Sequence, residues 1–399
     1  MDSGRDPRAV ARSLGELPQP DAAAQAASDA LTALIRGEIE QAGGVIPFTR
    51  FMELALYAPG LGYYSGGSRK FGEGGDFITA PELSPLFSRC LARQCAQILE
   101  QLIGGELLEF GAGSGTMAAE LLAELERLER VPQHYYIMEL SGELRQRQQA
   151  TLNARVPHLA TRVIWLDRLP ASFRGVMLGN EVLDAMPVHR FMVTEGGARE
   201  VGVSWRDGQF VDALVPESAP VVTAYLEALC TEVALSEGYR SELNSAAQEW
   251  VATLATTLAV GAILLIDYGF PRREYYHPQR GDGTLMCHYR HRAHGDPYRF
   301  IGLQDITAHV DFTAIAEAAQ QHGLHVAGYA SQASFLLASG LLEMAGEACD
   351  TRTQMERANQ IKRLVQTEEM GELFKVLALT RGIEGGLLGF ALRDDRGRL

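Results

Sequence analysis

Apolar positions recur along the chain with two different periods. From residue 85 onward, stretches with apolar residues at helical spacing alternate with short runs that are almost wholly apolar. We expect strands at residues 106–110, 134–139, 162–166, 175–179, 262–267, 324–329 and 387–392, and helices at 85–102, 116–128, 143–152, 241–260 and 311–322. Apolar strands separated by helices of this length predict a parallel α/β sheet with helices on both faces.

Other segments depart from this alternation. Residues 21–41 and 48–57 predict helices, and residues 58–85 form a loop rich in glycine and proline. A loop of this length is usually functional or disordered, and its interspersed aromatic residues favour an ordered, functional loop. Apolar and polar residues alternate at 190–215, with hairpin turn signals, and predict a small antiparallel sheet. Apolar residues at 333–380 recur with a helical period.

These segments suggest a division of the chain into three parts. Residues 1–20 are expected to be a disordered polar lead, and residues 21–105 to hold the N-terminal helices and the glycine-rich loop. Residues 106–393 would form the main domain, with insertions at 190–240 and 333–380. One domain with large insertions and two closely packed lobes both fit a length of 399 residues.

Composition excludes several classes of protein. Hydrophobic residues make up 46% of the chain and charged residues 22%, which is typical of a globular protein. The net charge of −14 argues against binding to nucleic acid, which needs a basic surface. The five cysteines are scattered without a C-x-x-C pair, no apolar run is long enough to span a membrane, and no clear signal or transit peptide is present. We therefore expect a cytoplasmic protein of bacterial type.

A glycine-rich turn follows the first expected strand of the main domain. A turn of this kind exposes backbone N–H groups and the positive end of a helix dipole, and its glycines let a ligand approach the backbone. The turn contains Glu109, Gly111, Gly113, Gly115 and Thr116. The dinucleotide pattern G-x-G-x-x-G would need glycine where Thr116 stands, so a nicotinamide cofactor fits less well. The pattern E-x-G-x-G-x-G resembles the first motif of class I methyltransferases, which bind S-adenosylmethionine (AdoMet).

An acidic residue ends the next expected strand. From this position the Glu139 carboxylate can accept hydrogen bonds from two ribose hydroxyls. The alternative is a surface carboxylate near a helix start, which Ser141 and the helix dipole would favour. Together with the glycine turn, Glu139 favours AdoMet as the cofactor, and we expect Glu109 to reach the ammonium group of AdoMet.

Several segments resemble the MidA-like proteins, whose mitochondrial member is an arginine-methylating assembly factor of respiratory complex I. The resemblance spans roughly residues 30–393 and rests on GLGYY at 60–64, GGDFITAPELS at 74–84, EFGAGSGT at 109–116, GNEVLDAMP at 179–187, DYG at 267–269, CHYRHRAH at 287–294 and DITAHVDF at 305–312. It implies a class I methyltransferase (Rossmann-like) sheet with an N-terminal helical and loop extension, a β-hairpin insertion and a helical insertion. It also implies methyl transfer to an arginine of a protein, with a complex I subunit as a candidate partner.

An arginine acceptor would require nearby carboxylates. The guanidinium group is protonated at neutral pH and its lone pairs are delocalised, so carboxylates must bind it and accept the released proton. The candidate catalytic residues are Glu181 and Asp184, which follow the fourth expected strand, and Asp76 and Glu82 in the long loop.

Alternatives remain for each of these acids. Asn180, which we expect at the cofactor, could cap a helix that has Glu181 in its first turn. Asp76 and Glu82 could cap turns, and Glu82 lies in a helix-start pattern. Asp267, at a strand end, is a further candidate. We expect no metal site, because the cysteine and histidines at 287–294 are irregularly spaced and lie among arginines.

Three functions therefore stay open at this stage, with a nicotinamide oxidoreductase as a more distant fourth. The first is an AdoMet-dependent methyltransferase that modifies a protein arginine, and the second is an AdoMet methyltransferase with another acceptor. The third is a non-catalytic assembly factor that retains the fold.

Replacement of Gly113 by valine tests the assignment of the glycine turn. A side chain at this position would occupy the place where the cofactor approaches the backbone, so Gly113→Val should block AdoMet binding. Titration calorimetry with AdoMet measures this, and an unchanged affinity would contradict the assignment.

Overall fold

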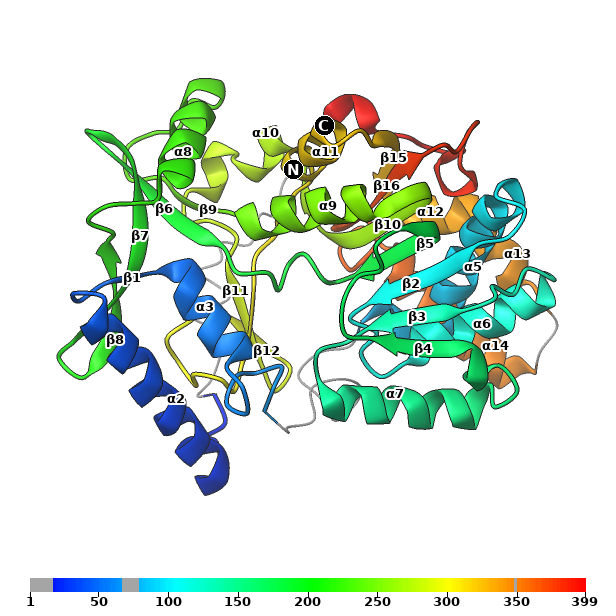
Figure 1. Ribbon diagram of the computed structural model, residues 1–399, viewed down its shortest axis with the longest axis horizontal. Helices are drawn as coiled ribbons and strands as arrows, with labels where there is room; N and C mark the ends of the chain where they lie inside the picture. Colours follow the sequence, from blue (N-terminus) through cyan, green and yellow to red (C-terminus); the bar gives the residue numbers. More distant parts are fainter. Residues whose placement is uncertain (1–16, 67–78, 348–349) are drawn as a thin grey trace. The chain divides into compact units, whose positions relative to one another are not determined.

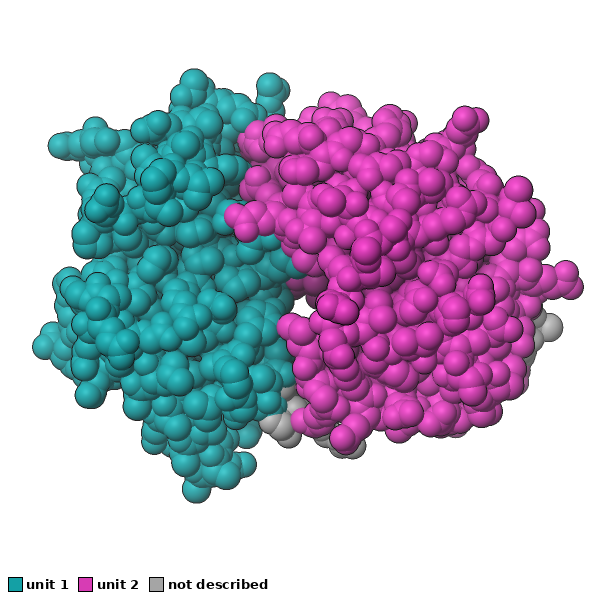
Figure 2. Space-filling model, viewed as in Figure 1, with its two compact units in different colours: residues 1–77, 185–246, 273–309 teal, residues 78–184, 247–272, 310–399 magenta. Residues whose placement is uncertain are grey.

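The computed structural model describes residues 17–66, 79–347 and 350–399 (Figure 1). The chain folds into two compact units, each assembled from separate segments (Figure 2). Unit 1 comprises residues 1–77, 185–246 and 273–309, and unit 2 comprises residues 78–184, 247–272 and 310–399. The N-terminal part expected at 21–105 is thus divided between the units. Of the expected disordered lead, residues 1–16 lie outside the described residues, whereas Leu17 is buried.

Unit 2 is built on a mixed sheet that has eight strands in the described part of the chain. The strand order is β4-β3-β2-β5-β10-β16-β15, with β14 paired to β10. All neighbours are parallel except β16, which is antiparallel to β10 and to β15. The strands are β2 (Glu106–Phe110), β3 (Tyr135–Met138), β4 (Val163–Leu166), β5 (Phe173–Asn180), β10 (Leu258–Phe270), β14 (Val310–Asp311), β15 (His325–Ser331) and β16 (Phe374–Arg381).

Helices cover both faces of this sheet, as expected from its apolar strands (Figure 1). One face packs Leu107, Val176 and Leu264 against helices that include α5 and α6. On the other face, the Phe110 ring meets the edge of Trp250 from α9, with ring centroids 4.9 Å apart. The helices with residues in unit 2 are α4 (Ala80–Leu83), α5 (Pro85–Gln101), α6 (Thr116–Arg127), α7 (Gly142–Arg155), α9 (Ser245–Thr257), α11 (Phe312–Gln321), α12 (Gln332–Ala338), α13 (Leu341–Ala345) and α14 (Thr351–Val365).

The described residues of unit 1 form two antiparallel sheets. The larger one has the order β1-β7-β6-β9 with β8 on β7, and the smaller one has the order β12-β11-β13. The hairpins at 190–215 confirm the expected antiparallel insertion. The strands are β1 (Ile46–Pro47), β6 (His189–Thr194), β7 (Gly197–Arg206), β8 (Gln209–Leu214), β9 (Arg240–Leu243), β11 (Met286–Tyr289), β12 (Arg292–His294) and β13 (Asp305–Thr307).

In the described part of unit 1, three helices accompany these sheets, and a fourth short helix begins at Arg272, the last residue of a unit 2 segment. They are α2 (Ala22–Gln41), α3 (Phe48–Tyr57), α8 (Pro220–Glu232) and α10 (Arg272–Tyr275). The expected helices at 21–41 and 48–57 are confirmed, and their apolar faces form a core around Leu31, Phe48 and Phe51. None of the described helices combines the length and the apolarity that crossing a membrane requires.

The prediction of a helical insertion at 333–380 is wrong in its last part. The last helix of this region, α14, ends at Val365, and residues Phe374–Arg381 form strand β16 between β10 and β15. A strand that is buried on both faces shows no polar alternation, so its apolar run cannot be distinguished from a buried helix by period.

Two other expected elements also differ. The strand expected at 387–392 is a 3₁₀ turn, Leu388–Phe390, whose Phe390 ring packs against Phe335 of α12 with centroids 5.6 Å apart. The helix expected at 241–260 is shorter, because β9 occupies its beginning and β10 starts at Leu258. In both places tertiary packing overrides the local pattern.

One carboxyl group is buried within the sheet of unit 2. The Glu109 side chain on β2 is 1% exposed, and the Tyr135 hydroxyl donates a hydrogen bond to its Oε2 at 2.6 Å. Burial raises the pKa of Glu109 to about 7, although the Tyr135 hydrogen bond opposes the shift. The folded protein therefore holds a proton on Glu109 under conditions in which the unfolded chain has released it.

Glu109→Gln should flatten the dependence of stability on pH. Between pH 4.5 and about 7 the folded state binds more protons at Glu109 than the unfolded state does, so this group makes stability fall as pH rises through that interval. The effect amounts to about 3 kcal/mol for a shift of this size, and glutamine removes it. Unfolding free energies measured at pH 5 and pH 8 test this, with Glu249→Gln on the exposed surface of α9 as control. An equal pH difference in the wild type and in Glu109→Gln would contradict the assignment.

Candidate active site

Two loops meet where the strand order of the sheet reverses. The chain continues from β2 to β3 and β4 on one side, and β5 then pairs with β2 on the other side. At such a point, the loops at the carboxyl ends of the strands diverge and leave a crevice for a ligand. Here the loops are residues 111–115 after β2 and residues 181–184 after β5, and Glu139 follows the neighbouring β3.

Two of the three glycines of the first loop have different roles. Gly111, Gly113 and Gly115 have φ angles of 63°, 51° and 83°, which favour glycine. A β-carbon on Gly113 would meet no atom within 4 Å, so this edge of the turn borders open space. A β-carbon on Gly115 would instead lie 2.9 Å from Cα of Gln148 in α7. Gly113 therefore leaves room for a ligand, whereas Gly115 lets α7 pack against the turn.

Glu139 is oriented by two hydrogen bonds. The backbone N–H of Ser141 donates to its Oε1 at 2.9 Å, and Nε2 of Gln148 donates to its Oε2 at 3.1 Å. Burial raises the pKa of Glu139, and these two hydrogen bonds act in the opposite direction because they stabilise the carboxylate. Ser141 also caps α7, as its Oγ accepts from the backbone N–H of Leu144. The cap and the oriented carboxylate thus coexist, and the capping alternative does not compete with a ribose-binding role.

The residue after Glu139 was not recognised from the sequence. The Leu140 side chain is 85% exposed beside the oriented carboxylate, which is unusual for a large apolar group. An exposed apolar side chain beside a carboxylate could contact the adenine while the carboxylate binds the ribose of AdoMet. Gly113 would thus border the cofactor at the glycine turn. Glu139 would bind the ribose of the cofactor, and Leu140 would lie beside its adenine.

The side chains of two other residues that we expect to bind the cofactor make hydrogen bonds within the protein. Glu109 is buried against Tyr135, and Thr116 begins α6 with its hydroxyl oxygen 2.8 Å from Oγ of Ser114. Their roles in binding AdoMet stay predictions.

Carboxylates gather at the ends of β5 and β10. Oδ2 of Asp267 accepts from the backbone N–H groups of Leu183 at 2.9 Å and Asp184 at 3.3 Å, and its Oδ1 accepts from the N–H of Tyr268 at 2.9 Å. Asp267 and Asp184 are only 1% and 5% exposed. Burial raises the pKa of Asp267 well above its usual value, and the charges of Asp184 and Glu181 raise it further.

Glu181 adopts a backbone conformation that is uncommon for a side chain of its kind. Its φ is 53°, its N–H donates to the carbonyl of Ile266 at 2.8 Å, and Nδ2 of Asn180 donates to its Oε1 at 3.0 Å. No helix begins at Asn180 in the described structure, so the helix-cap alternative for Asn180 and Glu181 is wrong. A left-handed, non-glycine residue at the ligand end of a sheet is typical of functional sites.

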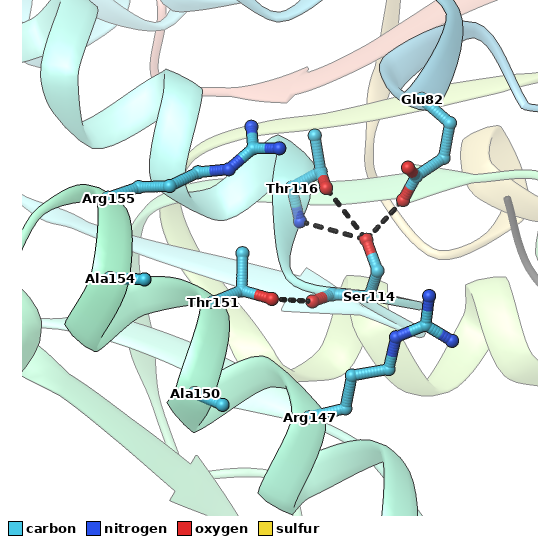
Figure 3. A pocket seen from close by; sticks show the side chains of 8 residues that line it. All are labelled: Glu82, Ser114, Thr116, Arg147, Ala150, Thr151, Ala154 and Arg155. Atoms are coloured by element: carbon cyan, nitrogen blue, oxygen red, sulfur yellow. Dashed lines mark hydrogen bonds between the residues drawn. The ribbon is translucent and has the colours of Figure 1, made fainter.

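The acids of the long loop are placed differently. Asp76 lies outside the described residues. Glu82 lies on α4 and accepts a hydrogen bond from Oγ of Ser114, which fixes the glycine turn to this helix. Glu82 lines a pocket of about 410 Å³ together with Ser114, Thr116 and a row of α7 residues that includes Arg147 and Arg155. Figure 3 shows these side chains. The catalytic role of Glu82 stays a prediction.

The segment with Cys287 lies in unit 1. Cys287 and His288 belong to β11, and His294 ends the paired β12. Within the described residues, no group of three or more cysteine, histidine or acidic side chains is arranged to hold a metal ion.

Comparison with known proteins places this geometry among methyltransferases. A family model described as "Putative S-adenosyl-L-methionine-dependent methyltransferase" matches residues 90–330, which is more than half of the chain. A solved structure from Burkholderia thailandensis bound to S-adenosyl-homocysteine is 51% identical, with a TM-score of 0.93, and covers 96% of this chain and 100% of its own.

Curated relatives are more distant. The zebrafish (Danio rerio) mitochondrial protein arginine methyltransferase NDUFAF7 is 28% identical over 377 residues, covering 85% of this chain and 84% of the relative. The human protein of the same name is 29% identical over 386 residues, covering 86% of this chain and 82% of the relative.

The family model and the solved structure show that the cofactor of the chain is AdoMet and that its sheet is that of a class I methyltransferase. The chain belongs to this family of S-adenosyl-L-methionine-dependent methyltransferases, the MidA-like proteins that its sequence resembles.

Proposed function

We propose that this methyltransferase transfers the methyl group to an arginine side chain of a protein. The observation that carries the proposal is the group of carboxylates formed by Glu181, Asp184 and Asp267. Glu181 and Asp184 follow β5, and Asp267 lies near the carboxyl end of β10. Strand β5 is the direct neighbour of β2, which leads into the glycine turn. A cation bound at these carboxylates would therefore lie at the same edge of the sheet as the cofactor.

Electrostatics favours a cationic acceptor. Like charges in a buried site raise each other's pKa, and Asp267 shows this effect from both Asp184 and Glu181. A guanidinium group offers five N–H donors in a planar array and would relieve this repulsion through paired hydrogen bonds. We assign Glu181 and Asp184 to the guanidinium. Asp267, which accepts three backbone N–H bonds, positions the loop that carries both residues.

The protein would contribute to this reaction mainly by holding the two reactants close together and in line. Bound AdoMet supplies a methyl group activated by its sulfonium. An arginine nitrogen forms the bond to the methyl carbon while the carbon–sulfur bond breaks, and the proton of that nitrogen passes to a carboxylate. Alignment of two bound reactants can supply roughly 7–11 kcal/mol of the barrier. The carboxylates would hold the nitrogen in line and accept its proton.

The relatives support the same acceptor. The zebrafish and human proteins are named as protein arginine methyltransferases, and each covers more than four fifths of this chain. The resemblance to the MidA-like family adds a subunit of respiratory complex I as a candidate partner.

Labelling identifies the acceptor. The purified protein is incubated with methyl-labelled AdoMet and a lysate of cells that lack its gene, and the labelled product is located by mass spectrometry. We expect the label on arginine of a protein. Label on another residue or on a small molecule, or no transfer at all, would contradict the proposal while leaving AdoMet binding intact.

Glu181→Gly should separate function from stability. Glycine relieves the left-handed backbone and removes one of the crowded charges, so the melting temperature should rise by a few degrees, or about 1 kcal/mol. Methyl transfer should fall by about 100-fold or more, because the guanidinium loses a carboxylate. Thermal unfolding, calorimetry with AdoMet and transfer assays measure the three quantities, and AdoMet affinity should change little.

Glu129→Gly is the matched control for this variant. Glu129 is an exposed residue with φ 57° at the end of α6, so glycine relieves the same backbone conformation. It should raise stability and leave methyl transfer unchanged. Full activity of Glu181→Gly would remove Glu181 from the mechanism.

A further inference from the structure

Gln148 is a buried polar side chain at the centre of the cofactor site. It lies on α7 and is fully buried, although most other residues of this helix are partly or fully exposed. Its Nε2 donates to the carbonyl of Gly113 at 3.1 Å and to Oε2 of Glu139 at 3.1 Å. Its Oε1 accepts from the indole N–H of Trp165 on β4 at 2.8 Å. One amide thus connects the glycine turn, the acid after β3 and strand β4.

Trp165 determines which way this amide points. An indole N–H can only donate, so the atom of Gln148 that faces Trp165 must be the oxygen. The amide nitrogen must then face Gly113 and Glu139, both of which offer acceptors. The opposite orientation would place the amide oxygen against a carbonyl and a carboxylate, and would leave the indole donor without an acceptor. The buried network therefore has one satisfied arrangement.

The hydrogen bonds to Glu139 hold its carboxylate in one orientation. The N–H of Ser141 donates to Oε1, Nε2 of Gln148 donates to Oε2, and the backbone N–H of Leu140 also stabilises the carboxylate. Two neighbouring hydroxyls of a ribose are donors, and a carboxylate held in this way can accept from them.

We propose that Gln148 is a positioning residue for AdoMet, held in orientation by Trp165, which keeps Glu139 aligned for the ribose hydroxyls. Gly115 is required for the same arrangement, because a β-carbon there would lie 2.9 Å from Cα of Gln148 and would move α7 away from the glycine turn. The third glycine of the motif is thus needed for Gln148 to reach Glu139. This inference concerns the cofactor alone and holds whichever acceptor the enzyme uses.

Gln148→Glu tests the proposal with nearly unchanged shape. The new carboxylate would face Glu139 at the position where Nε2 now donates, so the two groups repel each other at pH 8. We expect the affinity for S-adenosyl-homocysteine to fall by about 10- to 100-fold at pH 8, as for loss of an oriented charged hydrogen-bond partner. At pH 6 the pair can share a proton and the hydrogen bond re-forms, so much of the affinity should return. Gln149→Glu, on the exposed side of the same helix, adds the same charge and should bind as the wild type does.

A ligand without ribose hydroxyls distinguishes positioning from general destabilisation. The wild type should bind S-adenosyl-homocysteine about 100-fold more tightly than its 2′,3′-dideoxy analogue, because two hydrogen bonds to a carboxylate are lost. In Gln148→Glu at pH 8, this ratio should shrink to less than about tenfold. A structural defect would instead weaken both ligands equally and preserve the ratio.

Trp165→Phe provides a milder second variant. It keeps an aromatic ring and removes the donor to Oε1 of Gln148, so the amide is held less firmly against Gly113 and Glu139. The ratio between the two ligands should therefore fall several-fold. Calorimetry with both ligands gives the ratios, and thermal unfolding reports whether each variant is folded. The proposal is overturned if the ratio stays at its wild-type value in folded Gln148→Glu and Trp165→Phe.

Discussion

At the amino ends of β2, β5 and β10, the backbones approach so closely that side chains are excluded. A β-carbon on Gly175 would lie 1.9 Å from the carbonyl oxygen of Glu106, and one on Gly261 would lie 1.8 Å from the carbonyl oxygen of Gly175. These contacts set the register of three parallel strands. Because the register is set at one end, the opposite ends are also aligned, and the loops after β2 and β5 are brought together. Both halves of the active site depend on this alignment.

A second constraint acts at the carboxyl ends. Asp267 accepts backbone N–H groups from Leu183 and Asp184, and the carbonyl of Ile266 accepts the N–H of Glu181. The loop after β5 is thereby fixed to the end of β10 by main-chain groups. Glu181 can keep a strained conformation because the backbone of the loop around it is fixed.

Local patterns predicted much of the sheet and part of the site. The helices from residue 85 to 180 were found by their helical period, and the strands between them by their short apolar runs. The glycine turn and Glu139 were found because their positions follow directly from strand ends. Strand β16 was missed because a strand buried on both faces lacks alternation.

Other parts of the site could not be found in this way. Gln148 gives no signal in the sequence, since it is one of several glutamines on a polar helix, and only its packing against Gly115 and Trp165 distinguishes it. Leu140 could have been noticed as an apolar residue directly after the acid, but its exposure is a property of the fold. The sequence marked Asp267 as a candidate acid, but its anchoring role depends on a loop that lies 83 positions away in the chain.

The proposed cofactor side and acceptor side of the site differ in the charges around their buried carboxylates. Glu139 receives hydrogen bonds from Ser141 and Gln148, which align its carboxylate within the protein itself. Burial raises the pKa of both Glu139 and Asp267, and at Asp267 the charges of Asp184 and Glu181 raise it further. The oriented carboxylate of Glu139 has the character of a preorganised binding group. Under the proposed function, a bound guanidinium would favour the ionised forms of the carboxylates beside it, because a positive charge stabilises a neighbouring carboxylate.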